Sequence, residues 1–131
     1  MNANELTVSR ELAQELDKRG VRFRSYFYWT DFGDSDGTEL YSVERFEPDD
    51  EDIEAPTAGE LMAVLPDYIE LSRRNEDGSA WWCSVEGALL EFTTQPTCWT
   101  WADTAPDACA KMLIWLIDNG HLTVNEKGEV V

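Results

Sequence analysis

Apolar and polar residues follow a helical period near the start of the chain. Residues 9–19 carry apolar side chains three and four positions apart, and Gly20 follows as a stop signal. The apolar positions are Val8, Leu12, Ala13 and Leu16. This pattern predicts an amphipathic helix that buries one face.

Strand periods occupy much of the middle of the chain. Apolar and polar residues alternate over 23–29, and a turn at 34–37 precedes a returning strand over Glu39–Phe46. Residues 47–56 have no periodicity and many like charges, which predicts a loop. Further strands are expected over 68–73, 80–86 and 88–93, joined as an antiparallel meander that continues the first hairpin or packs beside it.

Two further helices are marked by their caps. Thr57 and Glu60 have the spacing of a capping box, which starts a short helix that Pro66 ends. A longer helix is predicted from Ala105 to Asn119, and a short strand or tail over 122–125 follows. Because the long helix is apolar on most sides, it should lie at the centre of the fold.

The predicted fold class is α+β, with residues 1–131 forming a single domain. An antiparallel sheet of four to six strands would pack against the central C-terminal helix and the N-terminal helix. One short helix would connect these parts.

Charge changes the picture, because 27 acidic residues against ten basic ones give a net charge of −17. The segment 31–54 holds eleven acids and one base, Arg45, for a net charge of −10. Such a chain repels nucleic acid and anionic membranes and favours basic partners. Solubility or a saline habitat would account for the total charge, but neither accounts for its concentration in one segment.

The cysteines and the apolar segments point to a reducing compartment. Cys83, Cys98 and Cys109 are odd in number and show no CxxC spacing. The first residues lack the features of a signal peptide, and no apolar segment is long enough to cross a bilayer. We therefore expect a cytoplasmic protein with free thiols that has no contact with a membrane.

No complete catalytic or metal-binding motif is present. An EF-hand over the Asp-rich turn would place Phe32 and Val43 at its first and last ligand positions, so a solvated hairpin turn is favoured. The single histidine, His121, follows the last helix, where a structural role is favoured. Cys98, in a predicted loop, is the thiol that we expect to be exposed, whereas Cys83 and Cys109 should face the core. We predict no cofactor, no metal and no catalytic residue.

Two groups of residues are candidates for contact with a partner. The first is the densest acidic group, which comprises Asp49, Asp50, Glu51, Asp52 and Glu54. The second is aromatic, because strand alternation sends some large side chains away from the core. Its members are Tyr26, Tyr28, Tyr68 and Trp82. Adjacent Trp81 and Trp82 must point to opposite faces of a strand, so the outer face is either covered or an exposed aromatic patch. Trp99 and Trp101 are expected to plug the edge of the core beneath a loop.

Two segments resemble a known group of proteins. They are the APTAGELMAVLP run over 55–66 and the ACAKMLIWLIDNGHL run over 108–122. Together with the opening helix and the aromatic residues 26–29, they resemble small uncharacterised proteins of phages, prophages and gut bacteria. The resemblance implies a phage or prophage context and no active-site residues.

These features predict a non-enzymatic, acidic protein-binding module of phage or prophage type. Its partner would be a basic or nucleic-acid-binding protein, and it would not bind nucleic acid itself. In a sharper version, the acidic group mimics nucleic acid and inhibits a host defence or DNA-binding protein. One alternative is an accessory protein that forms a homodimer through an aromatic sheet face. Another is an enzyme without a recognisable motif.

Overall fold

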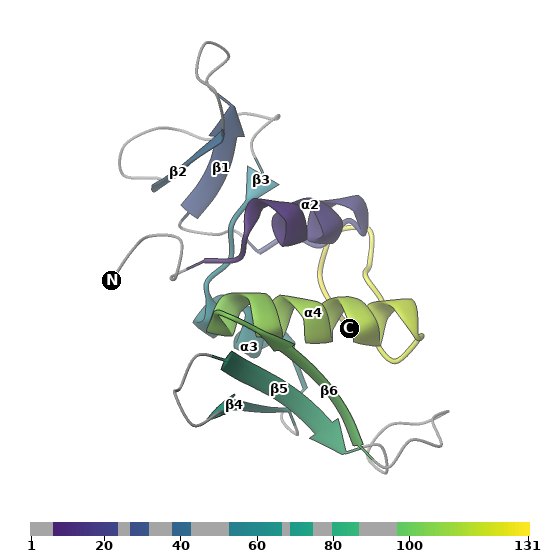
Figure 1. The fold of residues 1–131 in the computed structure, drawn as a ribbon. Coiled ribbons are helices and arrows are strands. Elements are labelled where there is room, and N and C mark those ends of the chain that lie inside the picture. Colours follow the sequence, from purple (N-terminus) through teal and green to yellow (C-terminus); the bar gives the residue numbers. More distant parts are fainter. Residues whose placement is uncertain are drawn as a thin grey trace.

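The computed structural model describes residues 7–23, 27–31, 38–42, 53–66, 69–74, 80–86 and 97–131. Within these ranges three helices and six strands form an α+β fold, which confirms the predicted class. The strands divide between two three-stranded antiparallel sheets, so the second group of strands does not continue the first hairpin. In Figure 1 the helices α2 and α4 lie between the two sheets.

Helix α2 (Arg10–Lys18) forms where the apolar period predicts it. The Ser9 side chain accepts a hydrogen bond from the backbone N–H of Leu12 and so satisfies one donor at the helix start. Ala13 and Leu16 are buried. Gly20 has a φ of +80°, a conformation that ends the helix at little cost for glycine.

The first sheet has the strand order β2-β1-β3. β1 (Phe27–Asp31) pairs with β2 (Thr38–Ser42), within the predicted hairpin. β3 (Ile53–Glu54) adds to the other side of β1, with Tyr28 opposite Glu54. The prediction of a loop over 47–56 is therefore wrong at residues 53 and 54. The turn at 34–37 lies outside the described residues.

Helix α3 (Ala58–Val64) begins with the predicted capping box. The Thr57 hydroxyl accepts from the Glu60 backbone N–H at 3.2 Å, and the Glu60 carboxylate accepts from the Thr57 backbone N–H at 2.9 Å. The helix ends two residues before Pro66. The capping box prediction is confirmed.

The second sheet has the strand order β4-β5-β6. It consists of β4 (Glu70–Arg74), β5 (Ala80–Glu86) and β6 (Thr97–Ala102), all antiparallel. β5 has the predicted bounds. β6 corrects the prediction of a loop at Cys98, because residues 97–102 pair with β5 along the whole strand. The predicted strand over 88–93 lies outside the described residues.

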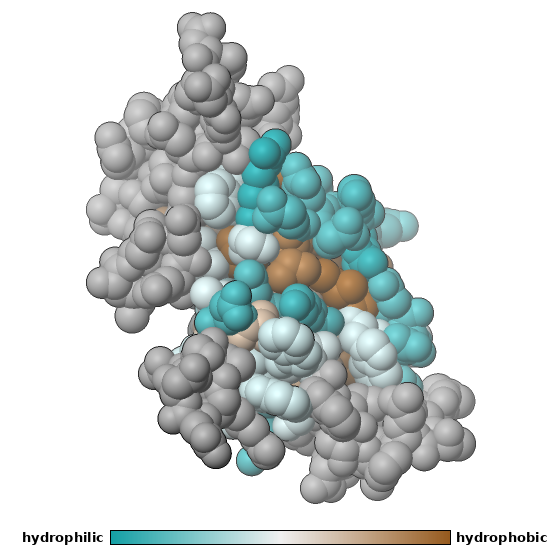
Figure 2. All heavy atoms as spheres, viewed as in Figure 1, coloured by the Kyte–Doolittle hydropathy of each residue, from teal (hydrophilic) through white to brown (hydrophobic). Residues whose placement is uncertain are grey.

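Helix α4 (Ala105–Asp118) is the centre of the fold, as predicted. It packs against α2, α3, β5 and β6, and it contributes the largest share of fully buried side chains. These are Pro106, Ala108, Cys109, Ala110, Met112, Leu113 and Leu116. Trp115 is only half-buried at the border of the core. Figure 2 shows apolar side chains gathered in the seam between α2 and α4, with hydrophilic side chains over the outer surface of α2.

Helices α2 and α4 are joined at both ends. At their N-terminal ends the Asp107 carboxylate accepts from the Ser9 backbone N–H at 2.7 Å. At their C-terminal ends Arg19 pairs with Asp118. The two helices therefore run parallel, side by side.

After α4 the chain folds back as a small hairpin, in which Val124 pairs with Val130. Only this bridge corresponds to the strand expected over 122–125. The Asn125 side chain accepts from the backbone N–H groups of Lys127 and Glu129, both at 2.9 Å. The Gly128 carbonyl accepts from the Arg22 backbone N–H, which ties the hairpin to the segment after α2.

Candidate partner-binding surface

The face of the second sheet that points away from α4 carries two tryptophans on neighbouring strands. Trp82 on β5 lies directly opposite Trp101 on β6. Their neighbours show which way they point: Cys83 is fully buried, and Trp81 packs against the core. Since side chains alternate along a strand, Trp82 faces outward. We call this surface, defined by Trp82 and Trp101, the Trp82–Trp101 face.

Trp101 is the most exposed aromatic residue among those whose side-chain burial is described. Its side chain is 55% exposed, and among the same residues the other exposed large apolar side chain is that of Val131. Trp82 is half-buried. The predicted alternation of Trp81 and Trp82 therefore holds, and the exposed aromatic side chain on this face is that of Trp101. The prediction that Trp101 plugs the edge of the core is wrong.

Lys111 of α4 contacts Trp101 at the border of this face. Its Nζ donates to the Trp101 backbone carbonyl at 2.9 Å and lies 5.6 Å from the centroid of the indole ring. A cation at this distance from an indole is attracted by the ring. The contact therefore links β6 to α4 and places one positive charge beside the exposed ring.

The inner face of the sheet explains why bulky residues lie outside. β6 approaches α4 closely, because the Thr100 hydroxyl donates to the Ala108 carbonyl at 2.8 Å. Thr100 and Ala102 face the helix, and Ala102 is buried. Small residues on both elements permit this short separation. The large side chain of Trp101 then takes the outward position.

Two thiols lie in this interface. Cys83 and Cys109 are free and fully buried, which confirms their predicted inward orientation. The hydrogen bond that the Cys83 thiol donates to Cys109, together with burial, raises the pKa of Cys83 far above its usual range, and the same bond lowers the pKa of Cys109. Because the thiolate is the nucleophile, a thiol held protonated in this way is inert. The Cys98 side chain lies outside the described side chains.

The remaining predicted residues lie elsewhere or outside the described ranges. Tyr28 and Glu54 belong to the first sheet, on the other side of α2 and α4 from Trp82 (Figure 1). Asp49, Asp50, Glu51, Asp52, Tyr26 and Tyr68 lie outside the described residues. The fold therefore does not bring Tyr28 and Glu54 onto the same surface as Trp82.

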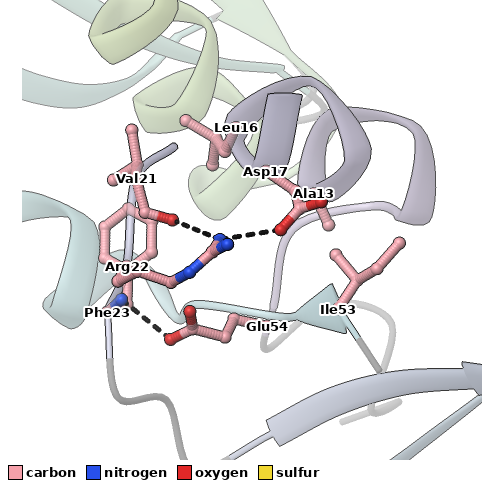
Figure 3. Close-up of a pocket in the computed structure, with 8 residues that line it drawn as sticks. All are labelled: Ala13, Leu16, Asp17, Val21, Arg22, Phe23, Ile53 and Glu54. Carbon is pink, nitrogen blue, oxygen red and sulfur yellow. Dashed lines mark hydrogen bonds and ion pairs between the residues drawn. The ribbon is translucent and has the colours of Figure 1, made fainter. Parts of the chain in front are cut away.

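Glu54 also has a role within the fold. Its carboxylate accepts from the Phe23 backbone N–H at 2.8 Å, and both residues line a small cavity beside α2. Figure 3 shows Arg22 reaching across this cavity to Asp17, with Nη1 2.7 Å from the carboxylate oxygen. The cavity has a volume of about 10 Å³, which suits one water molecule and no substrate. The role of Glu54 at an interface stays a prediction.

His121 lies just after α4 and contacts the end of that helix. The imidazole stacks on Trp115, with ring centroids 5.3 Å apart, and the His121 backbone N–H donates to the Leu116 carbonyl. In the described ranges no three His, Cys, Asp or Glu side chains gather as a metal site. Nor does any helix within them have the length and apolar character needed to cross a membrane.

Comparison of the chain with protein-family models, with curated proteins and with solved structures gives no match. The resemblance to phage and prophage proteins therefore stays a prediction. The candidate surface rests on its own geometry.

Proposed function

We propose that this protein is a non-enzymatic, acidic module that binds a basic protein and docks through the Trp82–Trp101 face. The observation that carries the proposal is the exposure of the Trp101 side chain on the second sheet, opposite Trp82. Tryptophan is the residue type most enriched among those that dominate binding energies, because it buries a large area with little loss of conformational freedom.

The chemistry of the described residues favours binding over catalysis. The Cys83 thiol is buried and held protonated, and His121 stacks on a tryptophan at the end of α4. The cavity beside α2 holds no more than a water molecule. The Trp82–Trp101 face, rather than this cavity, therefore carries the proposal.

The charge of the chain supports a basic partner. A net charge of −17 attracts positively charged proteins over several ångströms and raises their association rates. Mimicry of nucleic acid by Asp49, Asp50, Glu51 and Asp52 is the sharper form of this proposal. In either form, carboxylates would steer the partner and the tryptophans would hold it.

The test is affinity capture from the host cell, followed by binding measurements with the captured protein. We expect a basic protein whose affinity falls steeply between about 50 and 500 mM salt, since the Debye length shrinks several-fold over that range. Trp101→Ser should weaken binding by about tenfold or more, mainly by faster dissociation. Val131→Ser is the matched control, because Val131 is an exposed large apolar residue that pairs with Thr123 in the C-terminal hairpin.

Two outcomes would contradict the proposal. One is an acidic or neutral partner whose affinity does not change with salt. The other is a partner that binds Trp101→Ser as tightly as the parent protein. Neutralising residues 49–52 with Asn and Gln then separates mimicry from general steering, because only mimicry requires those four carboxylates.

A further inference from the structure

Two thiols meet where the second sheet packs against the central helix. Cys83 of β5 and Cys109 of α4 are free, fully buried, and joined by a hydrogen bond between their side chains. Strand β5 and helix α4 are separate elements that pack against each other (Figure 1). A covalent bond between these two sulfurs would therefore join the sheet to the helix.

The backbone around the two thiols brings them together independently. Cys83 lies directly opposite Thr100 of β6, so these two side chains share one face of the sheet. The Thr100 hydroxyl in turn donates to the Ala108 carbonyl at 2.8 Å. Ala108 directly precedes Cys109 in α4, and both residues are fully buried. The register of the sheet and one short hydrogen bond from the sheet to the helix thus fix the position of the thiol pair.

The two sulfurs differ in their chemistry. The hydrogen bond from Cys83 lowers the pKa of Cys109, although burial opposes its ionisation, whereas the same bond and burial raise the pKa of Cys83. The thiolate is the form of cysteine that reacts with an oxidant, so Cys109 is the first nucleophile of the pair. Cys83 is then the thiol that lies next to oxidised Cys109.

The surroundings of the pair restrict the kind of oxidant that can reach it. Both thiols belong to the apolar core cluster, which also contains Met112 and Leu113 of α4. A charged or bulky oxidant is excluded from such a site, whereas hydrogen peroxide is small and uncharged. Burial makes these thiols slower to react than an exposed thiol of the same pKa.

We infer that Cys83 and Cys109 form a dithiol site that hydrogen peroxide oxidises to a reversible disulfide between β5 and α4. In the first step the Cys109 thiolate attacks one oxygen of the peroxide, the O–O bond breaks, and the departing hydroxide takes up the proton that Cys109 released. Cys109 is then a sulfenic acid. In the second step the Cys83 sulfur attacks the Cys109 sulfur, the S–O bond breaks, and the departing hydroxide takes the Cys83 proton. Two electrons pass from the sulfurs to the peroxide, which leaves as two molecules of water.

The disulfide would act on the strand that carries Trp82. Because Trp82 directly precedes Cys83, the new bond ties this part of β5 to α4. Exchange with a small thiol would break the bond and restore both cysteines. The reaction needs no partner protein, so this inference does not depend on the proposed function.

The test treats the full chain with hydrogen peroxide, blocks the remaining thiols, and identifies the linked peptides by mass spectrometry without reduction. The chain has three cysteines, and Cys98 lies between the other two in the sequence. We expect the folded protein to lose two thiols and the mass of two hydrogen atoms. The Cys83–Cys109 linkage should exceed the other two linkages together by about tenfold, because the fold holds these two thiols in contact. Dithiothreitol should restore both thiols.

The same protein unfolded in guanidinium chloride is the matched control. Closing a short loop costs less entropy than closing a long one, so the unfolded chain should favour the two linkages that include Cys98. The Cys98–Cys109 linkage should then exceed the Cys83–Cys109 linkage by about threefold. A linkage pattern that changes in this way on unfolding would show that the folded structure selects the pair.

Variants separate the roles of the two thiols. All are made in the Cys98→Ser background, which leaves only the pair and should itself form the disulfide as fast as the full chain. Adding Cys83→Ser keeps a hydroxyl that can donate to Cys109, and should leave Cys109 as a sulfenic acid that dimedone labels. Adding Cys109→Ser should instead leave Cys83 reduced at the same exposure to peroxide.

Three results would overturn the inference. The first is a folded protein that keeps all three thiols at peroxide exposures that oxidise the unfolded chain completely. The second is a folded protein in which linkages to Cys98 predominate. The third is conversion of Cys109 to a sulfinic acid without any disulfide, since this would show that the Cys83 sulfur does not reach it. The test contains no other protein, so failure to find a basic partner would leave its outcome unaffected.

Discussion

Arg19 holds Asp118 with two parallel hydrogen bonds: its Nε lies 2.8 Å from Oδ1, and its Nη2 lies 2.7 Å from Oδ2. The remaining nitrogen, Nη1, donates to the Glu15 carbonyl at 2.8 Å and to its carboxylate at 3.0 Å. One guanidinium therefore joins the last turn of α2 to the end of α4. The fork of an arginine matches a carboxylate in this geometry better than a lysine does.

Asp118→Asn should lower the free energy of unfolding by about 0.5–1 kcal/mol, the usual range for a partly exposed pair of good geometry. Arg19 lowers the pKa of Asp118, so the pair stabilises the fold above the unfolded-state pKa of aspartate. This stabilisation is lost as the pH falls through the lowered pKa of the folded state. Urea unfolding of parent and variant at several pH values measures it. A difference between the two that does not shrink in acid would contradict the prediction.

Asp107 should respond to pH in the opposite direction. Burial raises the pKa of its carboxyl, even though the hydrogen bond from Ser9 favours the ionised form. Because the pKa is higher in the folded state, protonation favours folding, and this contribution grows as the pH falls. Asp107→Asn removes the titration while keeping an oxygen that can accept from Ser9.

The stability of Asp107→Asn relative to the parent should therefore decline on going from neutral to acidic pH. Urea unfolding of both proteins over the same pH series supplies the measurement. A constant difference, or a rise in acid, would show that Asp107 does not titrate in this way.

Gly128 and Gly120 form a matched pair for testing the C-terminal hairpin. Both have positive φ, +83° at Gly128 and +78° at Gly120. A Cβ at Gly128 would lie 2.5 Å from Cγ of Arg22, whereas a Cβ at Gly120 would meet nothing within 4 Å. Gly120→Ala should cost about 1–2 kcal/mol for the backbone conformation alone.

Gly128→Ala should cost clearly more, because Arg22 must also move. Thermal or urea unfolding of the two variants measures the difference. Equal losses of unfolding free energy in the two variants would mean that Arg22 can move away from a Cβ at position 128 at little cost.

Leu116 and Trp115 test where the core ends on α4. Leu116 is fully buried, and its replacement by Ala should cost about 3–4 kcal/mol, because the cavity is closed on all sides. Trp115 is half-buried and stacks on His121, so Trp115→Ala should cost less, about 2 kcal/mol. Denaturant unfolding of the two variants shows which substitution costs more free energy of unfolding. A larger loss at Trp115 would place the centre of the core closer to the end of the helix than the structure has it.

The elements that depend on local signals are the ones that the sequence predicts well. Thr57 and Glu60 form their capping box with neighbours three residues apart, and strand β5 follows a regular alternation. β6 is hard to predict because its small residues face the core and its large apolar residue faces outward. Close contact with α4 requires small residues on the inner face, so Trp101 points to solvent, and a pattern with large apolar residues outside is easily taken for a loop.

The other differences arise from contacts between distant residues. β3 consists of two residues next to a run of acids, and it is specified by its pairing with β1 and by the bond between Glu54 and Phe23. The candidate surface was predicted in part. Trp82 and its outward direction follow from alternation, whereas its neighbours Trp101 and Lys111 depend on β6 and α4, which lie 19 and 29 residues further along the chain.

The contacts that join α2 to α4 have a consequence for the order of folding. Ser9 and Asp107 are 98 residues apart, and Arg19 and Asp118 are 99 residues apart. Helix α2 has nine residues, too few to be stable alone in water. During synthesis α2 emerges from the ribosome before the α4 segment has been translated, so α2 gains its contacts with α4 only after nearly all of the chain has been made.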